Sequence, residues 1–402
     1  MIQATLRLYK NSYSGLTKRI WLLSLVMLIN RSGTMVLAFM TLYCRHLGFS
    51  TKQAGLVVAI YGMGAVTGAF LGGKVSDRFG FYYTQFCALF FGGILFIILG
   101  QMRSYESICI VTFLLSMVNE SFRPANSTAI AHYSNEKNRT QSFSLVRLAI
   151  NVGWGIGSAL GGLLASIDYH LLFWTDGITN IAASFMLLWV LPKVPLSQQK
   201  AASPHPQDVK TAATPYRDKP FLWFLLLQVL FAVCFFQLFT TVPLYFKEGL
   251  YLSEFWIGAV MSFNGILIAL FEMVLVFKLE GRRPYLQLMC YGTLLMGVSY
   301  AILNIPSGNG LLVAMGFSFM ITIAEMIAMP FMNSYYISRS TQQNRGQYAG
   351  LYTMAWSVAQ VIGSSLGALA AYQLGFFNLW MLIAALCVIT AVGYARLLRK
   401  SN

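Results

Sequence analysis

Six ionisable side chains lie far from the ends of long apolar segments in this chain of 402 residues. The acidic ones are Glu120, Glu272 and Glu325, and the basic ones are Arg31, Arg123 and Arg147. A charged side chain at the centre of a bilayer costs about 2.5–3.5 kcal/mol on insertion scales, so each of these residues is a candidate for function. A carboxyl group taken out of water binds a proton more readily, which is the chemistry that proton coupling requires.

Glu325 is the leading candidate for a proton carrier, because it lies in the middle of its apolar segment. Glu272 lies nearer the expected cytoplasmic end of its segment and could instead pair with Lys278 or Arg282 as a gate. Glu120 is the third candidate for proton coupling. We expect no metal site and no cofactor.

The basic residues differ in the partners that the sequence offers them. Arg123 lies three residues after Glu120, so the two share a helix face and can form an ion pair. Arg31 and Arg147 have no acidic residue at helical spacing, and we expect their partners on other helices or on a substrate. Asp176 lies near the outer end of its segment, where we expect it to contact water.

Amide and aromatic side chains in the same segments form a second group of candidates for contact with a substrate. The amides supply hydrogen bonds, and the aromatic rings supply adaptable apolar surface. These candidates are Asn30, Asn126, Asn151, Asn264, Tyr61, Trp154, Phe236 and Trp356.

The elements that must position these residues are membrane-spanning helices. The chain is 57% hydrophobic and only 10% charged, which excludes a soluble enzyme, a DNA-binding protein and a disulfide-stabilised secreted fold. Twelve apolar segments are long enough to cross a bilayer. They are residues 20–43, 52–73, 83–102, 106–131, 141–166, 171–192, 220–246, 254–277, 285–304, 309–333, 347–373 and 376–397.

Six segments lie on each side of a polar stretch, residues 193–219, that has the composition of a linker. We therefore expect an all-α membrane protein with an N-terminal six-helix bundle (1–192), a cytoplasmic linker and a C-terminal six-helix bundle (220–402). Most Lys and Arg residues fall on the side of the two termini, and the other side carries only Arg45, Lys52, Arg103 and Lys247. By the positive-inside rule, we expect both termini in the cytoplasm and the protein in the cell inner (plasma) membrane. The net charge of +15 favours contact with anionic lipid over nucleic acid.

The two halves of the chain repeat each other. A shift of 206 residues places Pro124 on Pro330, Asn138-Arg139 on Asn344-Arg345 and Gly157 on Gly363. Two similar halves can rock about a shared watery chamber and open it first to one side and then to the other. The repeat favours a transporter over a channel or a membrane enzyme.

The residues after the second segment resemble a family signature. Gly73, Asp77, Arg78 and Gly80 match the G-x-x-x-D-R-x-G motif of the major facilitator superfamily, with Phe81 and Tyr82 where two basic residues usually follow. The resemblance implies a gate in which Asp77 holds neighbouring helix ends. It also implies a twelve-helix transporter that functions as a monomer.

The fifth segment resembles two branches of that family. Gly153, Gly157 and Gly161 match the glycine-rich stretch of drug–proton antiporters, with Ser158 at the proline position. Their spacing of four residues lines one helix face and allows close packing, as do Gly363 and Gly367 in the repeat. Phe143, Arg147, Asn151 and Gly153 are similar to the F-x-x-x-Y-x-x-x-N-x-G signature of proton-coupled oligopeptide transporters, with Arg147 at the tyrosine position.

The combined reading is a proton-coupled secondary transporter that exports amphipathic or drug-like small molecules by alternating access. The alternative is a proton symporter that imports short peptides or other zwitterions. A membrane sensor or a lipid scramblase is a third hypothesis, against which the repeat and the buried carboxylates argue. Glu325 would carry the proton, and Arg31, Glu120, Arg123 and Arg147 would couple its protonation to movement of the N-terminal half.

Overall fold

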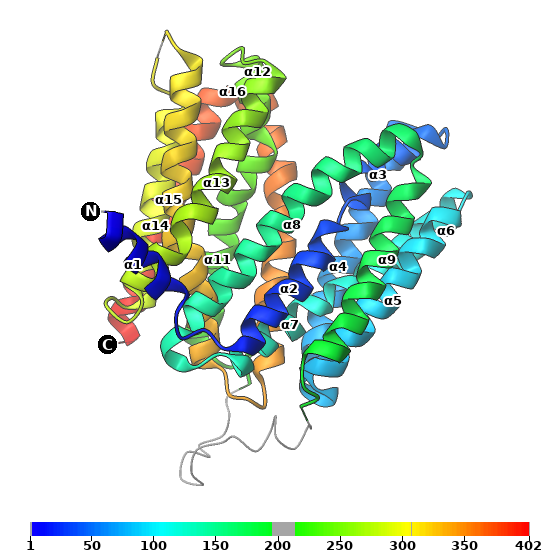
Figure 1. The fold of residues 1–402 in the computed structure, drawn as a ribbon. Helices are drawn as coiled ribbons and strands as arrows, with labels where there is room; N and C mark the ends of the chain where they lie inside the picture. Colours follow the sequence, from blue (N-terminus) through cyan, green and yellow to red (C-terminus); the bar gives the residue numbers. More distant parts are fainter. Residues whose placement is uncertain (1, 195–213, 307, 402) are drawn as a thin grey trace. The chain divides into compact units, whose positions relative to one another are not determined.

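The computed structural model describes residues 2–194, 214–306 and 308–401, and their regular elements are all helical (Figure 1). The all-α class that the apolar segments predict is confirmed. The helices of the first half are α1 (Ile2–Tyr13), α2 (Lys18–Ser32), α3 (Val36–His46), α4 (Thr51–Phe79), α5 (Phe81–Gln101), α6 (Tyr105–Glu120), α7 (Phe122–Tyr133), η1 (Glu136–Asn138), α8 (Arg139–Ile167) and α9 (His170–Val190). Those of the second half are α11 (Lys219–Phe236), η3 (Gln237–Phe239), α12 (Thr241–Glu248), α13 (Glu254–Leu279), α14 (Tyr285–Ile302), α15 (Gly310–Arg339) and α16 (Arg345–Ser401).

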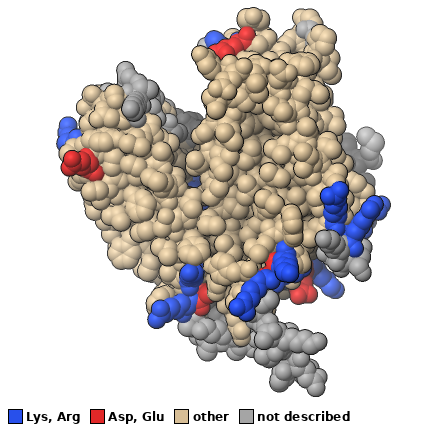
Figure 2. Space-filling model, turned by 180° about the vertical axis from the view of Figure 1, so that it is seen from behind, with Lys and Arg blue, Asp and Glu red and all other residues tan. Residues whose placement is uncertain are grey.

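Each apolar segment falls on a helix or on consecutive helices. Eight helical stretches among the described residues are long and apolar enough to cross a membrane. The last of them, within α16, covers two predicted segments, which Gly375 separates with a φ of 77°. In the face that Figure 2 draws, charged side chains gather near helix ends and leave the helix flanks uncharged. Most of the predicted linker, residues 195–213, lies outside the described residues.

Three predicted segments are interrupted. The first is divided into α2 and α3 at residues 33–35, and the fourth into α6 and α7 at Ser121. The seventh passes from α11 through the 3-10 turn η3 into α12. A break inside a membrane segment frees backbone groups that side chains must then satisfy, so the breaks indicate where buried polar side chains are needed.

The chain forms two compact units. The first, here called the N unit, contains Leu16–Pro215 and Ser340–Ser357. The second, called the C unit, contains Met1–Gly15, Tyr216–Arg339 and Val358–Asn402. Two pieces therefore differ from the bundle boundaries expected from the linker: α1 belongs with the second half, and the start of α16 belongs with the first.

Glycine residues allow close helix packing inside the N unit. A Cβ on Gly153 of α8 would lie 2.7 Å from the Cβ of Arg31 on α2, and one on Gly157 would lie 3.1 Å from the carbonyl oxygen of Arg31. A Cβ on Gly161 would lie 3.2 Å from that of Met35. The glycine face of α8 is therefore in contact with the broken first segment.

The C unit repeats this arrangement. A Cβ on Gly363 of α16 would lie 3.0 Å from the carbonyl oxygen of Val233 on α11, and one on Gly367 would collide with the side chain of Gln237. Gly363 and Gly367 are the residues that the 206-residue shift pairs with Gly157 and Gly161. The glycine faces of the fifth and eleventh segments thus pack against the first and the seventh, respectively.

The loops before these helices also correspond. Asn138 accepts a hydrogen bond from the backbone N–H of Asn135 at 2.9 Å, and Asn344 accepts one from the backbone N–H of Thr341 at 2.9 Å. Both amides are buried and bond the residue three positions earlier. The repeat therefore extends to the local hydrogen bonds that start the fifth and eleventh segments.

Candidate functional site

Charged and polar side chains from three segments of the N unit come together around Glu120. Glu120 Oε2 lies 3.1 Å from Arg123 Nη1, so the ion pair that the spacing predicts is present. Arg31 lies within electrostatic range of both residues and of Tyr61, and Tyr61 is within electrostatic range of Glu120 and Arg123. Arg123 is 40% exposed and Glu120 13% exposed. The group is therefore a partly open polar cluster rather than a closed core.

The start of α16 adds aromatic rings to the same unit. Tyr352 is within electrostatic range of Arg123 and Arg147, and it shares a side-chain hydrogen bond with Trp356. The centres of the two rings are 6.4 Å apart. We call Arg31, Tyr61, Glu120, Arg123, Arg147, Tyr352 and Trp356 together the N-unit cluster. Tyr352 was not among the candidates from sequence.

Glu325 lies in a buried polar group of the C unit. It is 2% exposed, and its Oε1 accepts a hydrogen bond from Asn264 Nδ2 at 2.6 Å. The same Nδ2 atom donates to the Thr322 hydroxyl at 2.8 Å, and Thr322 donates to the Ser318 carbonyl oxygen at 2.5 Å. Asn264 belongs to α13, whereas the other three belong to α15. Two helices thus position the carboxylate, and the bond from Asn264 comes from a neutral amide.

Glu272 lies on α13 close to the N-terminal helix. It is 2% exposed and within electrostatic range of Tyr13 of α1. The Tyr9 hydroxyl donates to the Leu270 carbonyl oxygen at 2.5 Å, which attaches α1 to the same part of α13. Contact between α1 and the Glu272 region gives no signal in the sequence.

The amide candidates fall into different places. Asn30 is buried and donates to the side-chain oxygen of Asn180 on α9 at 2.9 Å. Asn126 is buried and accepts a hydrogen bond from Gln85 on α5 at 3.1 Å. Both amides bond other helices inside the N unit, so these contacts give them a packing function. Asn264 alone among the amide candidates bonds one of the acidic candidates in the described structure.

The remaining candidates, Asn151, Trp154 and Phe236, are partly buried or exposed. Asn151 on α8 is partly buried. Trp154 is 46% exposed, whereas Gly153 beside it contacts α2. Phe236 is partly buried at the end of α11, next to Gln237. The structure does not bring Trp154 into the N-unit cluster.

Asp176 is not wetted as its position near a segment end predicts. It is 1% exposed, and its carboxylate accepts the backbone N–H groups of Met35 at 3.0 Å and Val36 at 2.8 Å. Those N–H groups begin α3, where they have no partner within the helix. The expectation was wrong because the break between α2 and α3 creates buried N–H donors, and the Asp176 carboxylate from another helix accepts them.

Gln237 does a comparable task in the C unit. Its Nε2 atom donates to the carbonyl oxygens of Val233 at 2.9 Å and Gly363 at 2.8 Å. Its Oε1 atom accepts the Thr241 hydroxyl at 2.8 Å, at the start of α12. A buried polar side chain therefore satisfies the broken first segment of each half, although the residue type and its helix differ.

The octet Gly73–Gly80 after the second segment is part of a second polar contact in the N unit. The Asp77 carboxylate accepts the backbone N–H groups of Gly346 at 2.7 Å and Gln347 at 2.9 Å, at the start of α16. A Cβ on Gly73 would lie 2.5 Å from the Gly346 carbonyl oxygen, so only glycine allows this approach. Negative charge at a helix N-terminus is favourable because of the unpaired N–H groups and the helix dipole.

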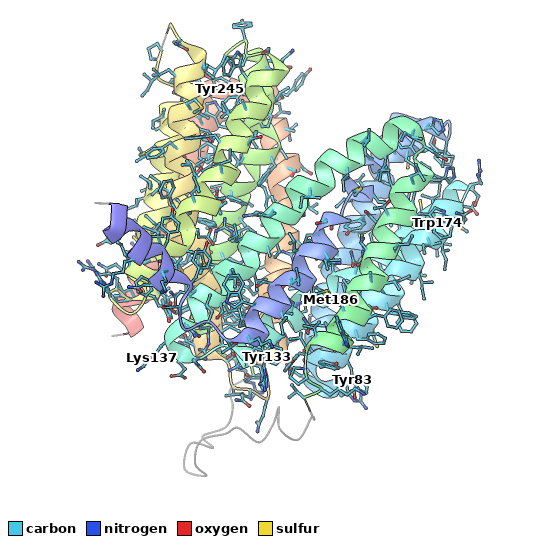
Figure 3. The ribbon with its side chains drawn as sticks, viewed as in Figure 1. Tyr83, Tyr133, Lys137, Trp174, Met186 and Tyr245 are labelled. Carbon is cyan, nitrogen blue, oxygen red and sulfur yellow. The ribbon has the colours of Figure 1, made fainter. Side chains whose placement is uncertain are left out.

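The other two motif residues shape the helix end. Gly80 ends α4 with a φ of 89°, a value that favours glycine, and its N–H donates to the Ser76 carbonyl oxygen at 2.9 Å. The Arg78 guanidinium lies over the Phe79 ring at 5.4 Å from its centre. Tyr133 at the end of α7 and Lys137 in η1 lie at the same end of the unit as Tyr83 at the start of α5 (Figure 3).

Sequence reasoning missed the glycine face of α4. Gly64, Gly68 and Gly72 recur every four residues and lie against α6, where a Cβ on Gly72 would be 2.5 Å from the Ser121 Cα. This packing brings Tyr61 beside Asn119 and Glu120. The spacing of four was visible in the sequence and gives the signal that could have found it. In the described residues, no three His, Cys, Asp or Glu side chains are close enough to hold a metal ion.

Comparisons with known proteins agree with this architecture. A model of the Major Facilitator Superfamily matches residues 20–364. A Na(+), Li(+), K(+)/H(+) antiporter of Planococcus maritimus is 25% identical over 365 residues, 83% of this chain and 85% of that protein. Multidrug resistance protein 1 of Bacillus subtilis (strain 168) is 21% identical over 332 residues, 80% of this chain and 81% of that protein.

A solved structure shows the same fold. The crystal structure of the human organic anion transporter MFSD10 (TETRAN) superposes with a TM-score of 0.72 at 14% identity, covering 93% of this chain and 98% of that chain. At this identity the likeness concerns the fold alone.

Proposed function

Because the chain belongs to the major facilitator superfamily, whose members are transporters, we propose that it exchanges protons for amphipathic, drug-like organic molecules by alternating access. The proton carrier is Glu325. The chain works as a monomer in the inner membrane, with both termini in the cytoplasm. The parts that rock are the two six-helix halves, in each of which a broken first segment packs against a glycine face.

The observation that carries this proposal is the environment of Glu325. A carboxylate that is 2% exposed has lost most of its hydration, and the hydrogen bond from the neutral Asn264 amide does not cancel its charge. Protonation removes the charge, so the protonated form is favoured when the site is closed to water and the ionised form when water enters. A group whose proton occupancy follows hydration is what proton coupling requires.

The relatives support exchange rather than co-transport. One of them is named as an antiporter of alkali cations and protons, and another as a multidrug resistance protein. The N-unit cluster supplies charged and aromatic side chains for an organic substrate. Its arginines would couple substrate occupancy to proton release from Glu325.

Flux in proteoliposomes tests the proposal. Protein reconstituted with an imposed pH gradient should move a fluorescent amphipathic dye against the proton flow, and a pH-sensitive dye in the lumen should report the proton movement. Glu325→Gln should reduce pH-driven dye flux at least tenfold, whereas equilibrium binding of the dye should persist. Movement of dye and protons in the same direction would instead support the symport of zwitterions.

A matched control separates coupling from general damage. Glu248→Gln changes an exposed carboxylate at the end of α12 and should leave flux unchanged. Glu272→Gln tests the second buried carboxylate of the C unit in the same assay. Full pH-driven flux in Glu325→Gln would remove Glu325 from the mechanism.

A further inference from the structure

We propose that the substrate is an amphipathic oxyanion and that the Arg31 guanidinium binds its carboxylate, sulfonate or phosphate group. This inference rests on the proposed function, because it names the substrate class of the same transporter. It differs from that proposal in the observation behind it, which is the charge of the N unit rather than the environment of Glu325.

The charges inside the spanning segments of the N unit do not balance. Apart from the exposed Glu106 at the first position of its segment, three of the described side chains there are basic, namely Arg31, Arg123 and Arg147, and two are acidic, Glu120 and Asp176. Asp176 is occupied by the backbone N–H groups of Met35 and Val36 on the far side of the helix break. Glu120 is in an ion pair with Arg123 at 3.1 Å. The local charge is therefore positive.

Arg31 is the residue through which this charge can act on a ligand. Its Nε atom is buried and, among the described residues, has no hydrogen-bond partner. A buried donor without an acceptor is unfavourable, and more so when it is charged. A guanidinium presents its N–H groups in a planar fork that fits the two oxygens of a carboxylate or phosphate. An oxyanion is thus the ligand that would satisfy it.

The backbone around Arg31 fixes its place. Gly153 and Gly157 pack against its Cβ and its carbonyl oxygen, and the break that Asp176 caps begins two residues later. Arg31 is therefore at the end of a short helix whose position is determined by α8 and α9. A side chain whose backbone and Cβ are already held loses less conformational entropy when it binds an anion.

Aromatic side chains in the same cluster account for the amphipathic part of the ligand. Tyr61 is close to Arg31, and Arg123 links this pair to Tyr352 and Trp356. Flat apolar rings beside a cationic group suit an aromatic or acyl body that carries one anionic head. A cationic amphiphile would meet net repulsion here, so the cluster discriminates by charge as well as by shape.

Equilibrium binding without any gradient tests this inference. Three probes share one ring system and differ in charge: 2-naphthoate, 2-naphthalenemethanol and 2-naphthylmethylammonium. Thermal stabilisation of the purified protein in nanodiscs, titrated with each probe, gives the three affinities. We expect 2-naphthoate to bind at least tenfold more tightly than the alcohol, equal to about 1.4 kcal/mol, and the ammonium to bind most weakly.

Variants assign the preference to Arg31. Arg31→Gln should lower the ratio of naphthoate to alcohol affinity to about one, whereas Arg31→Lys should keep part of it because the charge remains but the planar fork is lost. Arg103→Gln, which changes an exposed arginine outside the segments, should leave the ratio unchanged. Monodispersity of each variant on size exclusion shows that it is folded.

Each outcome decides the question. Equal affinities for the three probes, tightest binding of the ammonium, or an unchanged ratio in Arg31→Gln would overturn the inference. None of these results concerns proton coupling, which is read from pH-driven flux with Glu325→Gln. Full pH-driven flux in Glu325→Gln, or no pH-driven flux in the unchanged protein, together with an intact anion preference would overturn the proposed function and leave this inference standing as a binding property.

Discussion

Asp176 accepts the backbone N–H of Val36 at 2.8 Å, so a carboxylate of the sixth segment caps the helix that resumes after the break in the first segment. The neighbouring Asn180 receives the Asn30 amide at 2.9 Å from the helix before the break. The two ends of the interrupted segment are thus attached to one face of α9. This attachment positions Arg31 between them.

Removing the Asp176 carboxylate should destabilise the protein. Asp176→Ala leaves the Val36 N–H without its acceptor and leaves the Met35 N–H with only the Gly33 carbonyl oxygen at 3.1 Å, and we expect the free energy of unfolding to fall by about 1–3 kcal/mol. Asp176→Asn retains one acceptor oxygen and should lose about half as much. Thermal unfolding in detergent measures both changes. Asp168→Asn, with a side chain 55% exposed, is the control and should change little.

The glycine face of α8 gives a comparison within one helix. Gly153→Ala places a Cβ 2.7 Å from the Arg31 Cβ, and the resulting overpacking should cost about 1–3 kcal/mol. Gly155→Ala meets nothing within 4 Å and should stabilise the helix by up to about 1 kcal/mol. Thermal unfolding and flux should therefore separate two neighbouring glycines, and equal effects would contradict the close packing described here.

Neutralising Asp77 should weaken its contact with the start of α16. Asp77→Asn loses the charge that favours a helix N-terminus, and we expect a loss of about 0.5–2 kcal/mol together with altered flux. Arg78→Gln is the control, because its guanidinium contacts Phe79 and not the helix start. An Asp77→Asn variant with unchanged stability and flux would show that the contact of Asp77 with the start of α16 contributes to neither stability nor transport.

The ion pair between Asp218 and Arg339 should contribute to the stability of the C unit. Arg339 donates through Nε at 2.9 Å and Nη2 at 2.7 Å, a bidentate geometry, and the Asp218 side chain is 6% exposed. Asp218→Asn preserves the cap on α11, so a double-mutant cycle with Arg339→Gln isolates the pair. We expect a coupling energy of about 1–3 kcal/mol from thermal unfolding. Additive single effects would indicate that the pair contributes nothing.

Stability should fall in mild acid because of His132, which lies one residue beyond the predicted fourth segment. Burial, together with the positive charges of Arg345 and Arg19, lowers the pKa of His132 below its usual 6.5. Between the lowered pKa and 6.5 the unfolded chain binds more protons, so stability decreases as the pH falls through this window. His132→Gln should flatten the dependence of the unfolding temperature on pH between 7 and 5. An unchanged slope would show that another titrating group causes the pH dependence.

The helical class and the internal repeat could be predicted because they depend on local patterns. Apolar length, the spacing of Gly157 and Gly161, and the shift that pairs them with Gly363 and Gly367 are all visible along the chain. The ion pair of Glu120 with Arg123 follows from a spacing of three residues. These features need no knowledge of tertiary contacts.

The remaining parts of the site depend on contacts between distant residues. The Ser32-Gly33 pair is a local turn signal at the break in the first segment, but nothing in the sequence indicates which side chain satisfies the N–H groups after it, so the role of Asp176 could not be foreseen. Asn30 and Asn126 look equivalent to Asn264 in sequence, but they bond amides on neighbouring helices, whereas Asn264 bonds Glu325. The role of an amide depends on which neighbouring helix its own face of the helix contacts, and the sequence does not show that contact.

Gly375 has a practical consequence for experiments on this molecule. It alone separates the last two segments, with a φ of 77° and helical residues on either side. A connection of one residue offers no extended loop to which an antibody could bind or at which a protease could cleave. An epitope inserted there would have to unwind the helical turns on both sides. Accessibility mapping of that border should therefore use single-cysteine probes at the neighbouring helix ends instead of inserted tags.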